Sequence, residues 1–162
     1  MPAPVTAYVA LGSNLDDRRA HLEAAFAALD ALPDTRVEAR SAIYETAPLG
    51  PAGQQDYLNA VARLSTALTP HALLDALLAI ERARGRVRAE RWGPRTLDLD
   101  LLVHGDAVVR DDRLTLPHPG LPDRAFVLAP LHDVAPGLVL DGRTVADRLG
   151  SLDRSGVRRL AR

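Results

Sequence analysis

Hydrophobic residues in the first part of the chain alternate between extended and helical spacing. The apolar stretch 6–12 predicts a buried strand, and apolar positions across 15–32 recur at the spacing of an amphipathic helix. Ser13 or Asn14 is expected to cap that helix, because short polar side chains accept hydrogen bonds from its first N–H groups. Residues 35–46 alternate like a strand.

The middle of the chain repeats the order of a strand followed by a helix. A loop rich in Pro and Gly over 47–56 leads to an alternating stretch, 57–68, that predicts another strand. The next segment, 69–85, has helical spacing, with Thr69 as its cap and Gly85 after its end.

Further elements follow an arginine-rich segment at 86–95. Residues 96–103 predict a strand, and a hairpin is expected over 105–119. A helix at 124–135 and a short strand and helix within 137–149 complete the order. The order β-α-β-β-α-β predicts an α+β fold, the ferredoxin-like sandwich, with an antiparallel sheet, helices on one side and an extra C-terminal hairpin and helices.

The composition suits one globular domain over residues 1–162. Hydrophobic residues make up 47% and charged residues 25%, and the net charge is −1, which is typical of a chain that buries a core. The N-terminus lacks the basic and apolar regions of a signal peptide, and no apolar stretch approaches ~18 residues. We therefore expect a cytoplasmic protein without a membrane span.

Two residue types are missing from the chain, and each absence excludes chemistry. There is no cysteine, which excludes disulfides, thiolate catalysis and cysteine-bound zinc. All 20 basic residues are arginine, so no lysine is available for a Walker A loop or a Schiff base. No G-x-G-x-x-G motif occurs either. A nucleotide would therefore bind outside the two most common glycine-rich designs.

Two acidic residues, Asp98 and Asp100, interrupt the apolar strand predicted at 96–103. The side-chain period of a strand is two, so both carboxylates share one face while Leu99 and Leu101 share the other. Such a pair often only faces solvent. The functional alternative is a magnesium site, because hard cations take oxygen ligands and two carboxylates leave room for phosphate oxygens and water.

A run of cations precedes this pair. Residues 82–95 contain six arginines and one glutamate, a local charge of +5, while the net charge of the whole chain is −1. A solvated loop is one explanation, and a local anion site is favoured over a nucleic-acid surface because the rest of the chain is acidic. Arginines beside a possible metal site suit a nucleoside triphosphate, since phosphoryl transfer depends on positioning and charge stabilisation.

Aromatic residues are candidates for a ring-binding pocket beside the metal and phosphate site. Trp92 stands in a polar stretch, either partly buried or as a stacking surface. Tyr57 and Asn59 share a strand face and Phe126 lies early in a helix, so an aromatic sandwich with an amide specificity group is one interpretation and structural roles are the other. His118 is either a turn residue or a phosphate contact, and the other histidines fit no metal-ligand spacing.

Six stretches together resemble one known family. They are ALGSNL, YETAPLG, QQDYLNAV, IERARGRVR, ERWGPRTLDLDLL and LTLPHPGLPDRAFVLAPL, within residues 5–150 and in the family's order. The family is the 6-hydroxymethyl-7,8-dihydropterin pyrophosphokinases of folate biosynthesis, and the run RWGPRTLDLD is very specific to it. The resemblance implies a ferredoxin-like fold and transfer of the β,γ-diphosphate of ATP to the hydroxymethyl group of 6-hydroxymethyl-7,8-dihydropterin, with release of AMP.

The resemblance also assigns site residues. It implies that Asp98 and Asp100 bind two Mg²⁺ ions and are catalytic together with Arg86 and Arg95. The positions that match the ATP site are Glu81, Arg86, Arg88, Arg91, Trp92, Arg95, Arg113, Thr115, His118 and Arg124. The positions that match the pterin site are Gly12, Thr46, Leu49, Tyr57, Asn59, Trp92 and Phe126. The pterin ring is expected between Tyr57 and Phe126, with its amide edge at Asn59.

Four features depart from the family's pattern. Ala47 replaces a proline, Leu78 stands where some members have a polar residue near the adenine, and Pro119 occupies a position where an aromatic can occur. The arginine-rich stretch GRVRAERWG is also one residue shorter than other forms. These departures concern nucleotide affinity and loop timing, and leave the implied reaction unchanged.

A non-enzymatic interpretation competes with this one: a ferredoxin-like module that binds RNA or a small regulatory molecule. RNA recognition on such a sheet uses aromatic residues of the central strands, and aromatics make up only 4% of the chain. A regulatory module has no need of an acid pair beside arginines. We therefore expect an enzyme that acts on small molecules as a monomer, with no nucleic-acid or membrane partner.

The segment 85–93 is expected to close over the bound substrates. Val87 is its only sizeable aliphatic residue, so the segment cannot offset the entropy of ordering by itself. A triphosphate would order it through charge-assisted hydrogen bonds from Arg86, Arg88 and Arg91.

Overall fold

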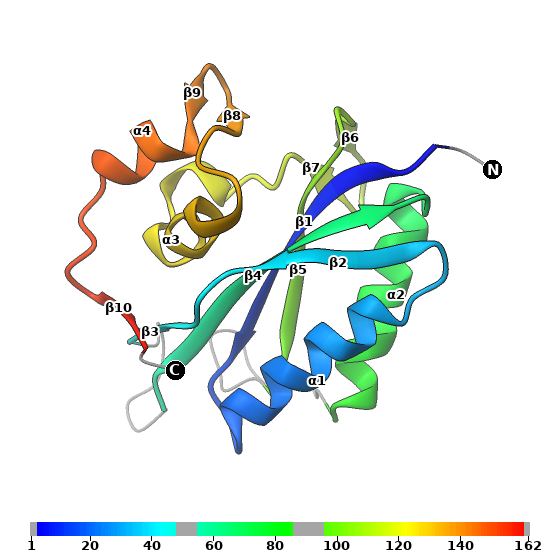
Figure 1. The fold of residues 1–162 in the computed structure, drawn as a ribbon, viewed down its shortest axis with the longest axis horizontal. Coiled ribbons are helices and arrows are strands. Elements are labelled where there is room, and N and C mark those ends of the chain that lie inside the picture. The colour runs from blue at the N-terminus through cyan, green and yellow to red at the C-terminus, as the bar shows by residue number, and fades with distance from the viewer. Residues whose placement is uncertain (1–2, 48–54, 86–95, 161–162) are drawn as a thin grey trace.

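The structure is a computed structural model that describes residues 3–47, 55–85 and 96–160. Six strands of these ranges form one antiparallel sheet in the order β10–β3–β4–β1–β5, with β2 also paired to β4 (Figure 1). They are β1 (Val5–Ser13), β2 (Thr35–Arg40), β3 (Tyr44–Thr46), β4 (Tyr57–Thr66), β5 (Asp98–His104) and β10 (Val157–Arg159).

Helices and two small hairpins surround this sheet. The helices are α1 (Arg18–Asp30), α2 (Pro70–Ala83), α3 (Ala125–Val134) and α4 (Val145–Gly150), with a 3₁₀ turn at Leu121–Asp123. The hairpins pair β6 (Val109–Arg110) with β7 (Thr115–Leu116), and β8 (Val139–Leu140) with β9 (Arg143–Thr144). Within the described ranges, no helix is long and apolar enough to cross a membrane.

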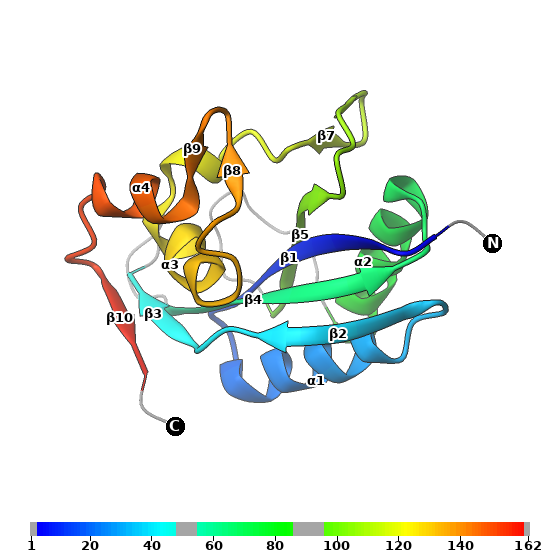
Figure 2. The same ribbon diagram turned by 45° about the horizontal axis from the view of Figure 1, so that its top comes forward.

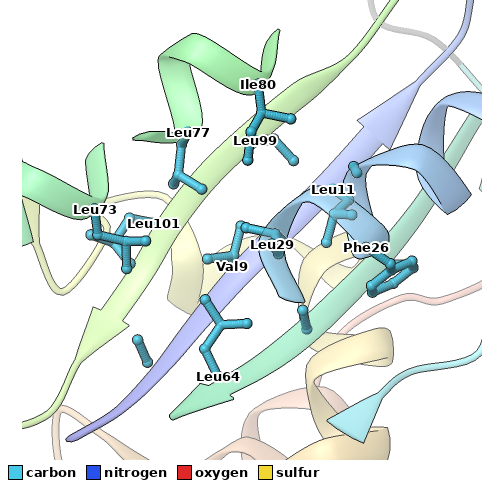
Figure 3. Close-up of a cluster of buried hydrophobic side chains, with 14 of the residues drawn as sticks. Val9, Leu11, Phe26, Leu29, Leu64, Leu73, Leu77, Ile80, Leu99 and Leu101 are labelled. Atoms are coloured by element: carbon cyan, nitrogen blue, oxygen red, sulfur yellow. The ribbon is translucent and has the colours of Figure 1, made fainter. Parts of the chain in front are cut away.

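Helices α1 and α2 cover one face of the sheet. On α2, Leu73 and Leu77 lie four residues apart and pack toward Leu99 and Leu101 of β5, as Figure 3 shows. Leu29 of α1 joins the same cluster, and all five side chains are buried. Because a buried leucine stabilises a fold by about 1.5–3 kcal/mol, this contact fixes which face of β5 is turned away from the helices.

Helix α3 packs on the opposite face (Figure 2). Its Leu128 and Leu131 are fully buried in a second cluster that includes Tyr8 of β1 and Val61 of β4. Both faces of the sheet are therefore covered, α1 and α2 on one side and the C-terminal helices on the other. The aspartates of β5 lie on the α3 face, because Leu99 between them packs against α2.

Two expectations about the first half of the chain are wrong in detail. The cap of α1 is Asp17, whose Oδ1 accepts a hydrogen bond from the Ala20 N–H at 3.1 Å. Ser13 cannot cap this helix because it is the last residue of β1, paired with Leu58, and Asn14 follows it directly. Pairing of Ser13 with Leu58 of β4 carries β1 past its predicted end at residue 12, and the helix starts later.

The predicted strand 35–46 is divided into β2 and β3. At the break, Ser41 Oγ accepts a hydrogen bond from the Val61 N–H at 2.8 Å, and the Ser41 N–H donates to the Val61 carbonyl at 2.9 Å. A serine side chain therefore takes the place of a backbone acceptor in the ladder, and the strand resumes at Tyr44. Polar–apolar alternation continues through such a break, which is why the sequence pattern did not reveal it.

Other elements follow the predictions closely. Helix α2 is capped by Thr69, whose Oγ1 accepts from the Ala72 N–H at 3.2 Å, and Gly85 after its end has a φ of 80°. The hairpin expected over 105–119 is present as β6 and β7. Strand β10 was not predicted: it is three residues long and adds to β3 at an edge of the sheet.

Candidate active site

Strand register places three candidate residues in one row across the sheet. Gly12 of β1 is paired with Asn59 of β4 on one side and with Asp98 of β5 on the other. Paired residues in an antiparallel sheet turn their side chains to the same face. A residue assigned to the pterin and a residue assigned to the metal therefore flank a glycine, and the missing side chain of Gly12 leaves the space between them open.

The two aspartates of β5 share a face, as their spacing predicted. Asp98 is paired with Gly12 and Asp100 with Ala10, and Leu99 between them is buried against α2. Asp98 is half-buried, whereas Asp100 is exposed. This difference puts Asp100 nearer to solvent at the mouth of the site.

A cavity of about 640 Å³ opens over this row. Eleven of the predicted site residues line it: Gly12, Thr46, Tyr57, Asn59, Glu81, Asp98, Asp100, Arg113, His118, Arg124 and Phe126. Thr115 is exposed on β7 and is not among the described residues that line the cavity. The remaining predicted residues, Leu49, Arg86, Arg88, Arg91, Trp92 and Arg95, lie outside the described ranges, as does most of the segment expected to close over the substrates.

The half of the cavity that contains the residues predicted to bind the pterin is built on β3, β4 and α3. Asn59 is buried, and its Nδ2 donates a hydrogen bond to Thr46 Oγ1 at 2.9 Å, which fixes the orientation of the amide group. Thr46 is itself paired with Tyr57 in the β3–β4 ladder. A Cβ at Gly12 would lie 3.3 Å from Asn59 Oδ1 and 3.6 Å from Tyr57 Cδ1. A side chain at this position would therefore press on the Asn59 amide, and glycine leaves the amide undisturbed.

A turn before α3 positions two of the candidate ATP-site residues, His118 and Arg124. The Gly120 N–H donates to His118 Nδ1 at 3.1 Å, so the neutral ring carries its proton on Nε2. A Cβ at Gly120 would lie 2.6 Å from the Arg124 guanidinium, which therefore packs directly over this glycine. The same guanidinium lies 6.0 Å from the centre of the Phe126 ring. His118 and Arg124 consequently enter the cavity from one rigid turn.

Burial lowers the pKa of His118 from its ordinary value, and the charge of Arg124 lowers it further. The carboxylate of Asp100 acts in the opposite direction and raises that pKa. Because burial is the largest of the three effects, the ring is held neutral at pH 7. A neutral His118 can donate a hydrogen bond from Nε2 to an anionic ligand without adding a full charge.

Glu81 has a structural contact that its assignment to the ATP site did not suggest. The side chain is buried on α2, and its Oε2 accepts a hydrogen bond from the Leu99 N–H at 2.8 Å. Among the described strands, β5 lies at the edge of the sheet, so this backbone N–H has no strand partner on that side. Glu81 therefore fastens the aspartate strand to α2 while it also lines the cavity.

Several residues that line the cavity were not predicted as site residues. Among them, Leu74 was not singled out in the sequence, and Leu78 and Ala47 were named only as departures from the family's pattern. Leu74 and Leu78 lie one turn apart on α2 and are half-buried in the cavity wall, and Ala47 lines the wall after β3. Their helical spacing could have signalled a shared face, but the pattern cannot separate a core leucine from one that faces a cavity. Arg113 forms an ion pair with Asp75 of α2, which no sequence spacing indicated.

The donor set suits a hard cation with a phosphate ligand. Among the described residues, no three His, Cys, Asp or Glu side chains gather closely enough to hold a metal ion by themselves. Asp98 and Asp100 supply two carboxylates on one face, and a triphosphate and water would supply further oxygens. The chemistry of the pair therefore fits magnesium bound together with a nucleotide.

Comparison with known proteins identifies the family of this chain. A family model for 7,8-dihydro-6-hydroxymethylpterin-pyrophosphokinase (HPPK) matches residues 8–136. A 2-amino-4-hydroxy-6-hydroxymethyldihydropteridine pyrophosphokinase of Methylorubrum extorquens is 51% identical over 154 residues, covering 95% of this chain and 98% of the relative. The enzyme of that name from Pseudomonas aeruginosa is 51% identical over 154 residues, covering 94% and 95%.

Solved structures share the fold. An HPPK-DHPS crystallised in complex with substrates has a TM-score of 0.75 at 12% identity, covering 99% of this chain and 47% of that one. The Plasmodium falciparum HPPK-DHPS triple mutant with pteroate has a TM-score of 0.74 at 13% identity, covering 96% and 46%. This chain thus spans just under half the length of each solved chain. With the family model over most of its length and relatives half identical to it, the chain belongs to the 7,8-dihydro-6-hydroxymethylpterin-pyrophosphokinase family.

Proposed function

We propose that this chain carries out diphosphate transfer from ATP to 6-hydroxymethyl-7,8-dihydropterin, giving the pterin diphosphate and AMP for folate biosynthesis. The observation that carries the proposal is the row Asn59–Gly12–Asp98 at the floor of one cavity. It brings an amide that can read a heterocycle next to a carboxylate that can hold a metal ion. Family membership supports the same reaction.

In this proposal the pterin binds against β3 and β4. The Thr46 hydroxyl accepts one N–H of the Asn59 amide, so the carboxamide presents its remaining hydrogen-bonding atoms in a fixed orientation to the edge of the ring. Tyr57 and Phe126 line the cavity from β4 and α3, and the ring would stack between them. Leu49 and Trp92 are assigned to the same pocket on the family resemblance.

ATP is proposed to bind along β5 and α2. Of the four departures from the family's pattern, Leu78 bears on the adenine base, since Leu74 and Leu78 offer an apolar wall in this part of the cavity. His118, Arg113 and Arg124 line the same cavity and would donate hydrogen bonds to the triphosphate. Glu81 holds the strand that carries the aspartates. Arg86, Arg88, Arg91 and Arg95 are assigned as further phosphate ligands, with Arg86 and Arg95 at the transferred group.

Asp98 and Asp100 are proposed to hold two Mg²⁺ ions. When bound, magnesium would neutralise the charge of the triphosphate and polarise the phosphorus that is attacked. The protein's own contribution is positional: β5 presents both carboxylates on the face that the pterin pocket shares. Reaction then requires that the hydroxymethyl oxygen, held by the pterin pocket, lie in line with the β-phosphorus of ATP.

The chain is further proposed to be one ferredoxin-like domain. The elements β1, α1, β2, β4, α2 and β5 follow the order β-α-β-β-α-β, and the strand order β5–β1–β4–β2 with two helices on one face supports that fold. We also propose that the protein acts as a monomer in the cytoplasm on small-molecule substrates, without a nucleic-acid or membrane partner.

The test is formation of AMP from ATP in the presence of magnesium, with and without the reduced pterin. The proposal predicts AMP only when the pterin is present, in equal amount to a pterin product heavier by one diphosphate. A binding module that recognises either ligand without chemistry would form neither product. Hydrolysis of ATP to ADP with the pterin unchanged would also contradict the proposal.

A further inference from the structure

Behind the pterin half of the cavity, on the opposite face of β3, lies a group of four charged side chains. Glu45 follows Tyr44 and precedes Thr46, so the side chain of Glu45 points away from the face that Thr46 lines. Arg18, the first residue of α1, donates from its guanidinium to Glu45 Oε2 at 2.9 Å. Arg158 of β10 donates to the other carboxylate oxygen, Oε1.

The same guanidinium groups reach the start of β4. Arg18 donates to the Asp56 carbonyl oxygen at 2.8 Å, and Arg158 lies 3.5 Å from the Asp56 carboxylate. Just beside them, Asn14 Nδ2 donates to the Gln55 carbonyl oxygen at 3.3 Å. The group Arg18–Glu45–Asp56–Arg158 therefore joins the end of β3 to the beginning of β4, with α1 and β10 as its outer supports.

The two carboxylate residues of this ion cluster are direct neighbours in sequence of pocket residues. Glu45 is bonded in sequence to Thr46, and Asp56 to Tyr57, while Thr46 and Tyr57 are paired across the ladder. Thr46 in turn accepts the hydrogen bond that orients Asn59. A shift of Glu45 or Asp56 consequently moves the amide and the aromatic ring of the pterin pocket together.

We propose that this ion cluster positions the pterin pocket without touching the ligand, an inference that rests on the proposed pterin site. Glu45 is its centre, since this carboxylate receives both guanidinium groups and its side chain is only 17% exposed. Arg18 is second in importance, because its side chain is 25% exposed and has one partner on β3 and another just before β4. Arg158 is 64% exposed and contributes least.

The charges explain why position, more than stability, depends on the cluster. Two carboxylates and two guanidinium groups balance each other, and the exposed pair of Arg158 with Asp56 contributes little to the free energy of unfolding. A partly buried carboxylate that loses one partner moves to regain solvent or another donor, and here such a movement would displace Thr46. Displacement of a positioning group by about 1 Å can reduce a reaction rate about 10²-fold.

The experiment compares Glu45→Gln with Glu23→Gln. The glutamine side chain keeps the shape of the glutamate at this position but turns one NH₂ group toward a guanidinium, so one of the two arginines loses its acceptor. Glu23 is the matched control, because it also pairs with an arginine, Arg40, at 2.8 Å, but on the outer surface of α1 and β2. We expect KM for the pterin to rise about tenfold in Glu45→Gln, with KM for ATP unchanged and the control like wild type.

A double-mutant cycle separates positioning from general damage. Arg18→Gln should raise KM for the pterin less than Glu45→Gln does. The double variant should raise this KM by less than the product of the two single-variant fold-changes. Arg18→Lys should restore part of the lost affinity. Unchanged pterin KM in Glu45→Gln, or equal changes in the KM values for both substrates, would overturn the inference. Failure of the wild-type protein to form AMP with the pterin would instead contradict the proposed function.

Discussion

The carboxylate of Glu81 accepts a hydrogen bond from the backbone N–H of Leu99, at 2.8 Å, between the two aspartates of β5. The contact ties the edge strand that carries Asp98 and Asp100 to helix α2. Because the acceptor is a buried side chain and the donor is a backbone group, this contact fixes the position of β5 against α2.

Glu81→Ala is expected to destabilise the fold and slow the reaction. Removal of the acceptor leaves the Leu99 N–H buried without a partner, which costs about 1–3 kcal/mol. Glu81→Gln retains an oxygen acceptor and should unfold within a few degrees of wild type. Thermal unfolding and the rate of AMP formation measure the two effects, and an alanine variant equal to wild type in both would show that β5 is held without this contact.

Gly12→Ala is expected to weaken pterin binding and to spare ATP binding. The added methyl group would lie 3.3 Å from Asn59 Oδ1, so the amide must give way at the point where it meets the ring. We expect the Kd for the pterin to rise about tenfold or more by calorimetry. Gly137→Ala is the control, since a Cβ there meets nothing within 4 Å.

Thr46→Val tests the orientation of Asn59. The valine keeps the shape of the threonine but removes the acceptor of the 2.9 Å hydrogen bond, and a hydrogen bond of this kind contributes about 1 kcal/mol. The pterin Kd should therefore rise about fivefold, while Thr46→Ser should bind as wild type does. Equal Kd values for the valine and serine variants would mean that the amide is oriented by other contacts.

His21 should make the stability of the protein depend on pH below neutrality. Its Nδ1 accepts a hydrogen bond from Arg84 Nε at 3.0 Å, and its Nε2 is buried without a partner among the described residues. Burial lowers the pKa of His21, and the charge of Arg84 lowers it further, while Asp16 and Asp17 oppose both.

A histidine with a lowered pKa in the folded state binds protons more readily when unfolded. Stability is then fully present above the ordinary histidine pKa of about 6.5 and is lost as the pH falls toward the lower folded-state value. The Tm of wild type should fall more between pH 7.5 and 5.5 than the Tm of His21→Gln. His118, whose pKa is also lowered, is present in both proteins, so the difference between them isolates His21. Parallel curves would contradict the prediction.

The sequence predicted correctly those parts of the structure that depend on a single local pattern, such as strand alternation or a helix cap. The alternation of Asp98, Leu99 and Asp100 correctly placed both carboxylates on one face, because a buried leucine between them has only one core to enter. The cap of α2 at Thr69 was also predicted correctly, since a threonine followed by proline marks a helix start with little ambiguity.

Features that depend on a distant partner were not predictable. The break at Ser41 depends on the Val61 N–H, twenty residues away, and the ion pair of Arg113 with Asp75 joins a hairpin to α2. The short β10 pairs with the edge that β3 offers, more than 100 residues earlier in the chain. Each of these features is determined by a contact with a residue distant in sequence, and the local spacing of residue types cannot predict such a contact.

The central claim is that diphosphate transfer takes place where Asp98 and Asp100 face the pterin pocket. The most direct measurement is the rate of AMP formation by Asp98→Ala and Asp100→Ala at saturating ATP, pterin and magnesium, with the exposed Asp112→Ala as control. Each of the first two variants should keep the wild-type fold by circular dichroism and lose about 10³-fold or more in kcat, because a proposed metal ligand is removed and phosphate charge is left uncompensated. The control should keep the wild-type rate. Near-normal turnover by either β5 variant would contradict the account.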